Sequence, residues 1–341
     1  PYNLVADGDF SQTTTVNLNT DLEVNQKLDF ITPGLYINGK VSYSTLFKRN
    51  SQSAAMSYPT YYLDWTAIDS GEGNPWIASS ASTEVYVQEP YKISKDNKPT
   101  STHYTFYWEA SAHYDKSFGD HNLSAMALMY QRNDVLQAAF PSRTESYVGR
   151  INYNYKNKYL LETNLGITGS EQFSPKNRYG IFPSVAIGYA MSKEPWWQEA
   201  MPWWSTFKIR YSDGFVGGDA ASAQWLYFSA YDRDGSFIKE AAAANETARW
   251  EKAHKRNLGF EMGWFKDNLL LNVELFNEDR TDILITPLTT MFVVADYKDI
   301  NAGAIKKHGF EVELKYRNTT GGGLYYEVGG MFGYNENRIT A

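Results

Sequence analysis

The chain alternates apolar and polar residues at every second position over long stretches near its start. Between residues 16 and 28 the apolar side chains fall on even positions, and between residues 35 and 48 they fall on odd positions. Because successive side chains of a β-strand point to opposite faces, this pattern predicts two strands, each with one apolar and one polar face. The apolar positions are Val16, Leu18, Leu22, Val24 and Leu28, then Leu35, Ile37, Val41, Tyr43 and Phe47.

Both strands are longer than the strands of soluble proteins. They run for about 13–15 residues, whereas strands of soluble proteins usually have about 5–6. A strand of this length, tilted near 45°, rises roughly 30–35 Å and therefore exceeds the apolar band of an outer-membrane barrel, which is about 25 Å tall. The pattern thus predicts strands that cross a membrane.

The same alternation recurs along the chain, most clearly at residues 103–115, 269–275 and 310–316. We expect about twelve strands, near residues 15–30, 35–49, 102–116, 121–133, 144–156, 159–169, 181–192, 204–214, 256–266, 269–280, 306–317 and 323–337.

Short and long connections alternate between these strands. Short polar turns are expected at residues 31–34, 117–120, 157–158, 267–268 and 318–322, and long polar segments at residues 50–101, 134–143, 170–180, 215–255 and 281–305. Short turns on one rim and long loops on the other are typical of bacterial outer-membrane barrels. The fold class predicted is therefore all-β, a transmembrane antiparallel β-barrel.

The apolar side of such strands is predicted to face lipid and the polar side to face an aqueous lumen. The residues that we expect to contact lipid are Leu22, Val24, Val41, Phe106, Leu271, Val273, Val312 and Leu314.

The connection at residues 193–203 departs from the alternation, because it should be short and has eleven residues. It is rich in tryptophan, and indoles favour the membrane–water interface. We therefore expect an interface belt there; a tryptophan-rich helical turn packed on a core is the alternative. The four indoles are those of Trp196, Trp197, Trp203 and Trp204.

The amino-acid composition excludes several other classes of protein. The 341 residues carry a net charge of −7, contain no cysteine and are 16% aromatic. The absence of cysteine excludes thiol chemistry and disulfides, and the chain has no basic patch or RNP-type motif that would suggest nucleic-acid binding. No apolar run approaches the roughly 18 residues that a membrane helix needs, so a helical membrane protein is excluded.

Five segments in the middle of the chain, each at an expected strand or its rim, have a distinctive sequence. The first is GSEQFSPKNRYGIFPS at residues 169–184. The others are KIRYSDG at 208–214, RWEK at 249–252 with NLGF at 257–260, FNEDRTDIL at 276–284, and NAGAI at 301–305 with GFEVE at 309–313. All five resemble, in the same order, segments of the SusC/RagA family of TonB-dependent outer-membrane transporters, and the first is similar to the family's DGSSRFGPNNRYGYFPS. Two departures, ITG at 167–169 and KHG at 307–309, lie at strand ends and leave the expected fold unchanged.

The resemblance implies import of oligosaccharides, or less often peptides, across the outer membrane of a Bacteroidetes-like Gram-negative cell. It implies a SusD-like lipoprotein partner over the long loops and energy from the TonB complex through a plug domain. Nothing in the chain resembles that plug or the family's last strands. We therefore expect residues 1–341 to be an internal part of a larger barrel of about 22 strands.

Aromatic residues gather in the first and fourth long loops, where they suit stacking on sugar rings or gripping peptides. An alternative is that they pack the loops against one another. The candidates for contact with substrate are Tyr61, Tyr62, Trp65, Trp76, Trp225, Tyr227 and Tyr231.

No pattern in the sequence points to catalysis, a cofactor or a metal. The five histidines have no metal-ligand spacing, and residues 232–236, DRDGS, lack the distal glutamate of a calcium loop and are read as a turn. The run Ala241–Ala244 is read as a short helix or linker. We expect a protein that is not an enzyme, with no cofactor.

Two other functions stay open at this point. The first is a TonB-dependent receptor for a siderophore, haem or cobalamin, which would share the barrel and work without the lipoprotein. The second is a soluble carbohydrate-binding β-protein, which would bury the apolar faces of two sheets against each other and would have strands of about 5–6 residues.

Overall fold

The computed structural model describes residues 11–52, 61–71, 75–78, 99–136, 141–221, 224–234, 236–287 and 296–340. The chain divides into two units. The first comprises residues 1–19, 44–104 and 136–139, and the second comprises residues 20–43, 105–135 and 140–341. The second unit contains part or all of every strand of the main sheet.

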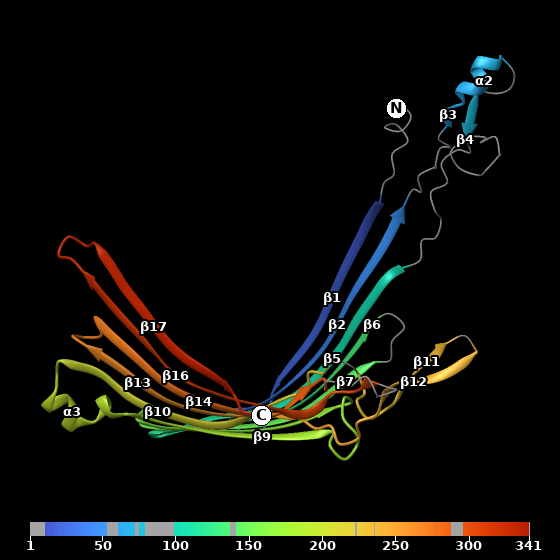
Figure 1. Cartoon of the computed structure of the whole chain (residues 1–341). Helices are drawn as coiled ribbons and strands as arrows, with labels where there is room; N and C mark the ends of the chain where they lie inside the picture. The colour runs from blue at the N-terminus through green and yellow to red at the C-terminus, as the bar shows by residue number, and fades with distance from the viewer. Residues whose placement is uncertain are drawn as a thin grey trace. The chain divides into compact units, whose positions relative to one another are not determined.

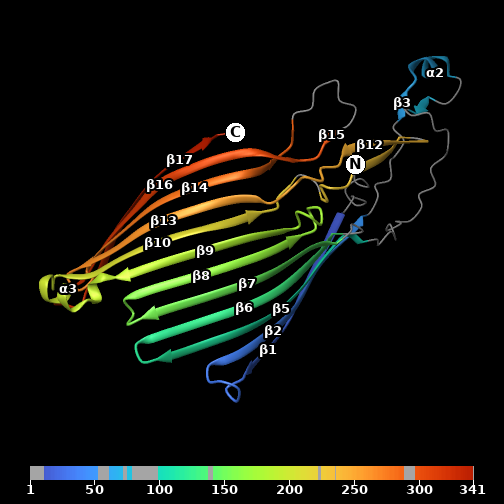
Figure 2. The same ribbon diagram turned by 90° about the horizontal axis from the view of Figure 1, so that it is seen from below.

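Twelve of the described strands form one sheet in which chain order and spatial order agree. From β6 onward every neighbouring pair is antiparallel. Figure 2 shows these strands side by side from β5 to β17. The strands, in order across the sheet, are β1 (Ser11–Lys27), β2 (Leu35–Gln52), β5 (Pro99–Phe118), β6 (His121–Leu136), β7 (Ser142–Tyr155), β8 (Tyr159–Ser170), β9 (Tyr179–Ala190), β10 (Trp204–Gly218), β13 (Glu251–Trp264), β14 (Leu269–Ile285), β16 (Ile300–Thr319) and β17 (Tyr325–Ile339).

All twelve predicted strands are confirmed, and several extend farther than expected at the ends that lead into long loops. β13 begins at Glu251 rather than near residue 256, and β16 begins at Ile300 rather than near residue 306. The ladder of backbone hydrogen bonds continues there although the apolar alternation has ended. The hydrophobic pattern marks only the part of a strand that has an apolar environment, whereas backbone pairing needs no such environment.

The register keeps the polar positions of neighbouring strands on one face and the apolar positions on the other. Asn152 lies opposite Glu162 on the polar face, and Val273 lies opposite Val312 on the apolar face. We call these two sides the polar face and the apolar face. Within the second unit the sheet is curved, as Figure 1 shows for β9 to β17.

The short turns are shaped by residues that adopt left-handed backbone angles. Gly34, which ends the turn between β1 and β2, has φ +90°. A Cβ atom at this position would lie 1.9 Å from the carbonyl oxygen of Asp115, whose own N–H donates to the Gly34 carbonyl at 2.9 Å. Only glycine fits both the angle and this close approach of backbone.

The long connections contain further elements. The loop between β2 and β5 holds a hairpin of β3 (Tyr61–Leu63) and β4 (Trp76–Ala78) and the helix α2 (Trp65–Ser70), capped by the Asp64 carboxylate on the Thr66 N–H at 3.0 Å. The loop between β10 and β13 holds the hairpin of β11 (Ala230–Asp234) and β12 (Phe237–Ala243), and β12 pairs with the short β15 (Asp296–Tyr297).

Two expectations about these loops are therefore wrong. Residues 215–255 are not one polar loop, because both ends belong to β10 and β13 and a hairpin lies between them. Ala241–Ala243 is not helical but forms the end of β12, because backbone pairing with β11 and β15 overrides the helix propensity of alanine.

No helix in the described residues has the length and apolar composition needed to cross a membrane. The connection between β9 and β10 contains a 3₁₀ turn at Met191–Lys193 and the short helix α3 (Pro195–Ala200).

Candidate functional site: the rim of long loops and the polar face

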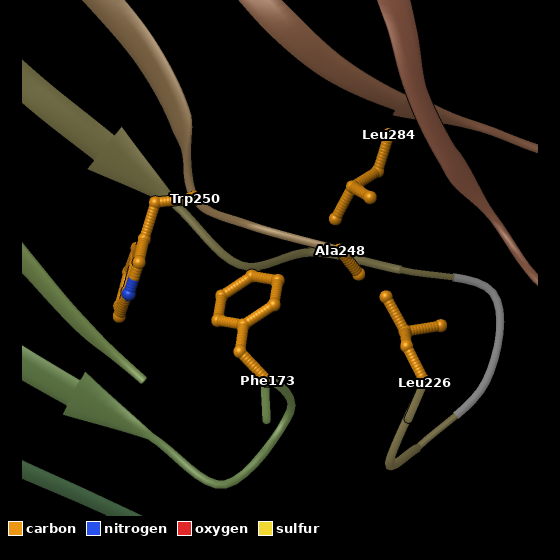
Figure 3. Close-up of a cluster of buried hydrophobic side chains, with 5 residues drawn as sticks. All are labelled: Phe173, Leu226, Ala248, Trp250 and Leu284. Carbon is orange, nitrogen blue, oxygen red and sulfur yellow. The ribbon is translucent and has the colours of Figure 1, made fainter. Parts of the chain in front are cut away.

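A buried apolar cluster fixes two long loops to the end of β14 at the rim of the sheet. Figure 3 shows its five side chains, which converge from the β8–β9 loop, the β10–β13 loop and the end of β14. Phe173 and Leu226 are fully buried, and the rings of Phe173 and Trp250 lie 5.4 Å apart. We call the set the rim cluster; it comprises Phe173, Leu226, Ala248, Trp250 and Leu284.

Polar contacts complete the base of these loops. The Trp250 indole N–H donates to the Arg178 carbonyl oxygen at 2.9 Å. The Asn301 side chain donates to the carbonyl oxygens of Arg249 and Asp282, at 2.8 and 2.7 Å, and its own oxygen accepts from the Arg249 N–H at 2.9 Å. These hydrogen bonds satisfy backbone carbonyl groups at the base of the loops, so the loops begin from fixed positions.

A buried lysine holds the loop that carries Trp225. The Lys298 ammonium donates to the carbonyl oxygens of Trp225 at 2.8 Å and Gln224 at 3.4 Å. Burial lowers the pKa of Lys298, because desolvation penalises its charged form. From the other side, the Gln172 side-chain oxygen accepts from the Trp225 N–H at 3.2 Å. Trp225 has φ +47°, a conformation that side chains rarely adopt and that these contacts maintain.

The predicted substrate-binding aromatics divide between the two units. Trp225, Tyr227 and Tyr231 belong to the second unit, where Tyr231 is exposed and the other two are half-buried. Trp65 and Trp76 belong to the first unit, and both are exposed. Tyr61 and Tyr62 form β3, but their side chains lie outside the described residues. Direct contact between these aromatics and a substrate stays a prediction.

The polar face carries a network of ion pairs across three neighbouring strands. Arg210 of β10 contacts Glu261 of β13 at 3.0 Å and also the carboxylate of Glu274 on β14. Lys208 contacts Glu261 at 3.2 Å, and the Asn257 amide donates to Glu274 at 2.6 Å. A hollow of 320 Å³ lies over this network. Six of its eight lining residues are charged or polar, and the other two are Val312 and Met331. This lining suits an aqueous surface that meets polar molecules.

The predicted lipid-facing residues of β14 and β16 share the apolar face. Leu271 lies opposite Leu314, and Val273 lies opposite Val312. The equivalent residues of β1, Leu22 and Val24, are exposed although they are apolar. Val41 and Phe106 are also exposed. Exposed apolar side chains in such continuous rows need a covering environment.

The four tryptophans at the connection between β9 and β10 form a continuous group of contacting rings and differ in exposure. Trp197 is buried, its indole N–H donates to the Trp204 carbonyl oxygen at 3.1 Å, and its ring lies 5.0 Å from that of Trp204. Trp196 and Trp203 are exposed. The helical turn considered as an alternative is therefore present, and Trp197 forms its core. An interface role stays a prediction for the exposed indoles.

Glu194 ties this turn to the neighbouring hairpin. Its carboxylate accepts from the Lys158 ammonium at 2.9 Å and from the hydroxyls of Tyr159 at 3.0 Å and Tyr189 at 3.3 Å. The hydrogen bond from Lys158 is the largest of the effects that lower the pKa of Glu194. A lowered pKa in the folded state means that the ionised carboxylate stabilises the fold.

We expect Glu194→Gln to remove a pH-dependent part of the stability of the turn. The variant should be less stable than the natural protein at neutral pH, where the difference in free energy of unfolding is largest. This difference should shrink as the pH falls below 4.5, the ordinary pKa of glutamate, and should vanish below the lowered pKa of Glu194. The measurement is urea unfolding followed by tryptophan fluorescence at several pH values. Glu199→Gln, in the exposed part of α3, is the control and should show no such trend.

Among the described residues, no group of three or more histidine, aspartate or glutamate side chains is arranged to hold a metal ion. The ionisable side chains of Lys208, Arg210, Glu261 and Glu274 on the polar face instead pair with one another or with an amide.

Comparison with known proteins identifies the fold. Residues 1–340 match the family described as "TonB dependent receptor-like, beta-barrel". The chain belongs to this family. TonB-dependent receptor P3 of Formosa agariphila is 26% identical over 263 residues, which are 66% of this chain and 26% of that protein. TonB-dependent receptor SusC of Bacteroides thetaiotaomicron is 24% identical over 220 residues, 60% of this chain and 22% of that protein.

Solved structures show the same fold. The RagAB peptide importer in its open-open state matches 99% of this chain and 38% of its own chain, with a TM-score of 0.73 and 15% identity. This barrel chain thus spans about a quarter of the length of the curated relatives named above. The resemblance to the SusC/RagA family, the barrel fold and the location in the bacterial outer membrane are confirmed.

The sequence did not reveal the rim cluster or Lys298. Three members of the cluster, Phe173, Trp250 and Leu284, lie inside the segments that resemble the family, and this was the one signal that the sequence offered. No signal in the sequence pointed to the burial of Lys298, because a lysine in a polar loop is usually solvated and only tertiary packing buries it.

Proposed function

We propose that this barrel forms part of a TonB-dependent importer of oligosaccharides, or of peptides, and acts with a SusD-like lipoprotein. The observation that carries the proposal is the anchored rim: a buried cluster holds loops with partly exposed aromatic side chains beside a sheet whose polar face is densely charged. The resemblance to the SusC/RagA family supports oligosaccharides as the cargo. Similarity in fold to the RagAB peptide importer supports peptides as the cargo.

In this proposal the two faces of the sheet have separate tasks. The apolar face contacts lipid through residues such as Val273, Val312 and Leu314, and the polar face lines the path of the cargo. The long loops face the cell exterior, where the lipoprotein covers them and their aromatics bind cargo. Energy from the TonB complex acts through a plug domain, and the barrel performs no catalytic reaction.

The test is uptake by cells in which the gene is deleted and then restored. Cells should lose growth on one class of oligosaccharide or peptide and regain it with the restored gene, and a lipoprotein should co-purify with the barrel in mild detergent. Loss of growth on an iron chelate, haem or cobalamin, with no co-purifying lipoprotein, would instead support a TonB-dependent receptor that works without a SusD-like lipoprotein.

Substitution of the exposed loop aromatics tests their role in binding cargo. We expect Trp65→Ala and Tyr231→Ala to weaken cargo binding roughly five- to thirtyfold, because truncating an aromatic contact residue commonly costs about 1–2 kcal/mol. Isothermal titration with the transported oligosaccharide or peptide measures the affinity. Trp203→Ala, an exposed tryptophan between β9 and β10, is the matched control, and an equal loss there would contradict the assignment.

A further inference from the structure

A short turn of the β10–β13 loop, residues 224–228, carries three aromatic side chains on a fixed backbone. We call it the aromatic turn; its rings are those of Trp225, Tyr227 and Phe228. Leu226, at its centre, is fully buried and points into the rim cluster, as Figure 3 shows. The Phe228 ring lies 4.3 Å from the Tyr227 ring and is 58% exposed. The turn is therefore anchored at its centre and keeps an aromatic ring accessible to solvent.

Hydrogen bonds hold the backbone of the two central residues on all sides. The Trp225 N–H donates to the side-chain oxygen of Gln172 at 3.2 Å, and the Leu226 N–H donates to the Gln172 carbonyl oxygen at 3.1 Å. The Trp225 carbonyl oxygen accepts from the Phe228 N–H at 3.1 Å, and the Leu226 carbonyl oxygen accepts from the Asn245 N–H at 2.7 Å. Because both N–H groups and both carbonyl groups are paired, the turn is held in one conformation.

Lys298, which directly follows β15, reaches the same turn from a third segment of the chain. Its side chain is 8% exposed, and its ammonium donates to the carbonyl oxygens of Trp225 and Gln224. Among the residues that the structure describes, no carboxylate lies within ion-pair distance of this ammonium. Burying an ammonium in this way costs free energy that an apolar side chain would not cost. What the lysine provides in return is a fixed position for the two carbonyl groups at the start of the turn.

The accessible ring has hydrogen-bonding side chains near it. Ser229 follows Phe228, and its hydroxyl donates to the Glu240 carboxylate at 2.6 Å. Glu240 and Gln224 are both exposed. Carboxylate and amide groups bond readily to hydroxyl groups. The aromatic turn thus combines an exposed apolar ring with polar groups that suit a polyhydroxylated ligand.

A pyranose ring matches this combination better than a peptide side chain does. The C–H groups on one face of a pyranose are attracted to the negative face of an aromatic ring, while its hydroxyl groups extend sideways. Such a ring needs only a flat surface, which Phe228 offers because more than half of its side chain is exposed. The side chains that dominate peptide binding are instead enclosed in pockets.

We propose that the aromatic turn binds a pyranose ring of an oligosaccharide on Phe228, and that Lys298 is the residue that positions the turn. This inference rests on the proposed function and assigns oligosaccharides as its cargo. Lys298 does not contact the sugar but acts through the carbonyl group of Trp225. Because the turn is ordered before the sugar arrives, little conformational entropy is lost on binding.

The experiment is isothermal titration of the intact protein, purified from outer membranes in mild detergent, with maltohexaose, cellohexaose, mannohexaose and xylohexaose. We expect Phe228→Ala to weaken binding of the sugar that binds the natural protein roughly tenfold. Lys298→Met should weaken it roughly fivefold, because methionine fills the space but donates no hydrogen bond, so the turn must be ordered on binding. Phe265→Ala is the matched control, since Phe265 is 60% exposed but lies in the short β13–β14 turn.

A double variant separates a positioning residue from one that only stabilises the fold. In the Phe228→Ala background, Lys298→Met should weaken binding by less than about twofold more, because residues that act through one contact are not additive. Hydrogen exchange without any sugar should rise at residues 224–228 in Lys298→Met. It should stay unchanged in Lys239→Met, which alters an exposed lysine of β12 and is the control.

Fully additive losses in the double variant, or unchanged exchange in Lys298→Met, would overturn the role of Lys298. Unchanged affinity in Phe228→Ala, or an equal loss in Phe265→Ala, would overturn the sugar site on the turn while import of oligosaccharides could still stand. Binding of none of the four sugars by the natural protein would also overturn the sugar site. The proposed importer is judged separately by the uptake assay, which uses no variant of the turn.

Discussion

Replacing Trp250 with alanine is expected to lower the free energy of unfolding by about 3–5 kcal/mol, the usual cost of removing a buried large aromatic side chain. Trp250 is 6% exposed, its ring contacts Phe173 and Phe182, and its indole N–H bonds to the Arg178 carbonyl oxygen. The alanine variant leaves a cavity beneath the loops and an unpaired carbonyl group. Urea unfolding of the protein in lipid bilayers measures the change.

The same variant should release the long loops before the sheet unfolds. Hydrogen exchange should therefore rise first at residues 172–178 and 224–229, whose backbones depend on the rim cluster. Trp203→Ala, at an exposed tryptophan outside the cluster, is the control and should cost far less. If both variants cost the same, the rim cluster does not hold the loops.

Replacing Val273 with arginine is expected to cost about 2–4 kcal/mol, because a charge at the middle of the hydrocarbon is penalised on the lipid face of a barrel. Val273 lies at the centre of the apolar face, opposite Phe260 on one side and Val312 on the other. The measurement is again urea unfolding in lipid bilayers, which compares the variant with the natural protein.

The neighbouring position provides the control for this substitution. Asn272 lies one residue away on the polar face, between Glu261 and Glu313 in the register. An arginine at Asn272 would meet two carboxylates at an aqueous surface, so Asn272→Arg should change the free energy of unfolding by less than about 1 kcal/mol. A cost at Asn272 as large as that at Val273 would refute the placement of the apolar face in lipid.

The strands and their two faces could be predicted from the sequence because they depend on a local rule. A strand side chain points to the face that its position parity dictates, so the alternation at residues 310–316 is enough to place Phe310 and Leu314 together. The ends of the strands were less predictable. β13 begins at Glu251 and β16 at Ile300, before the apolar pattern of either strand starts, since backbone pairing continues in water.

The chemistry of the site was less accessible. The sequence predicted that charged residues would lie on the polar face, but it did not show that Arg210 joins Glu261 and Glu274, which are more than fifty residues away along the chain. Nor did it show that Trp197 is the buried member of its group while Trp196 is exposed. Both facts depend on which strands and turns meet.

By itself the sequence determined that this protein is a barrel of long two-faced strands with loops of unequal length, because strand periodicity and turn composition are properties of neighbouring residues. Only the tertiary structure decided which residues act together. The rim cluster brings Phe173 of the β8–β9 loop against Leu226 and Trp250 of the β10–β13 loop, and the register of β16 and β17 sets Lys306 against Arg338. Register and loop packing are long-range choices, fixed by the simultaneous burial of apolar groups and pairing of polar ones, and no local pattern encodes them.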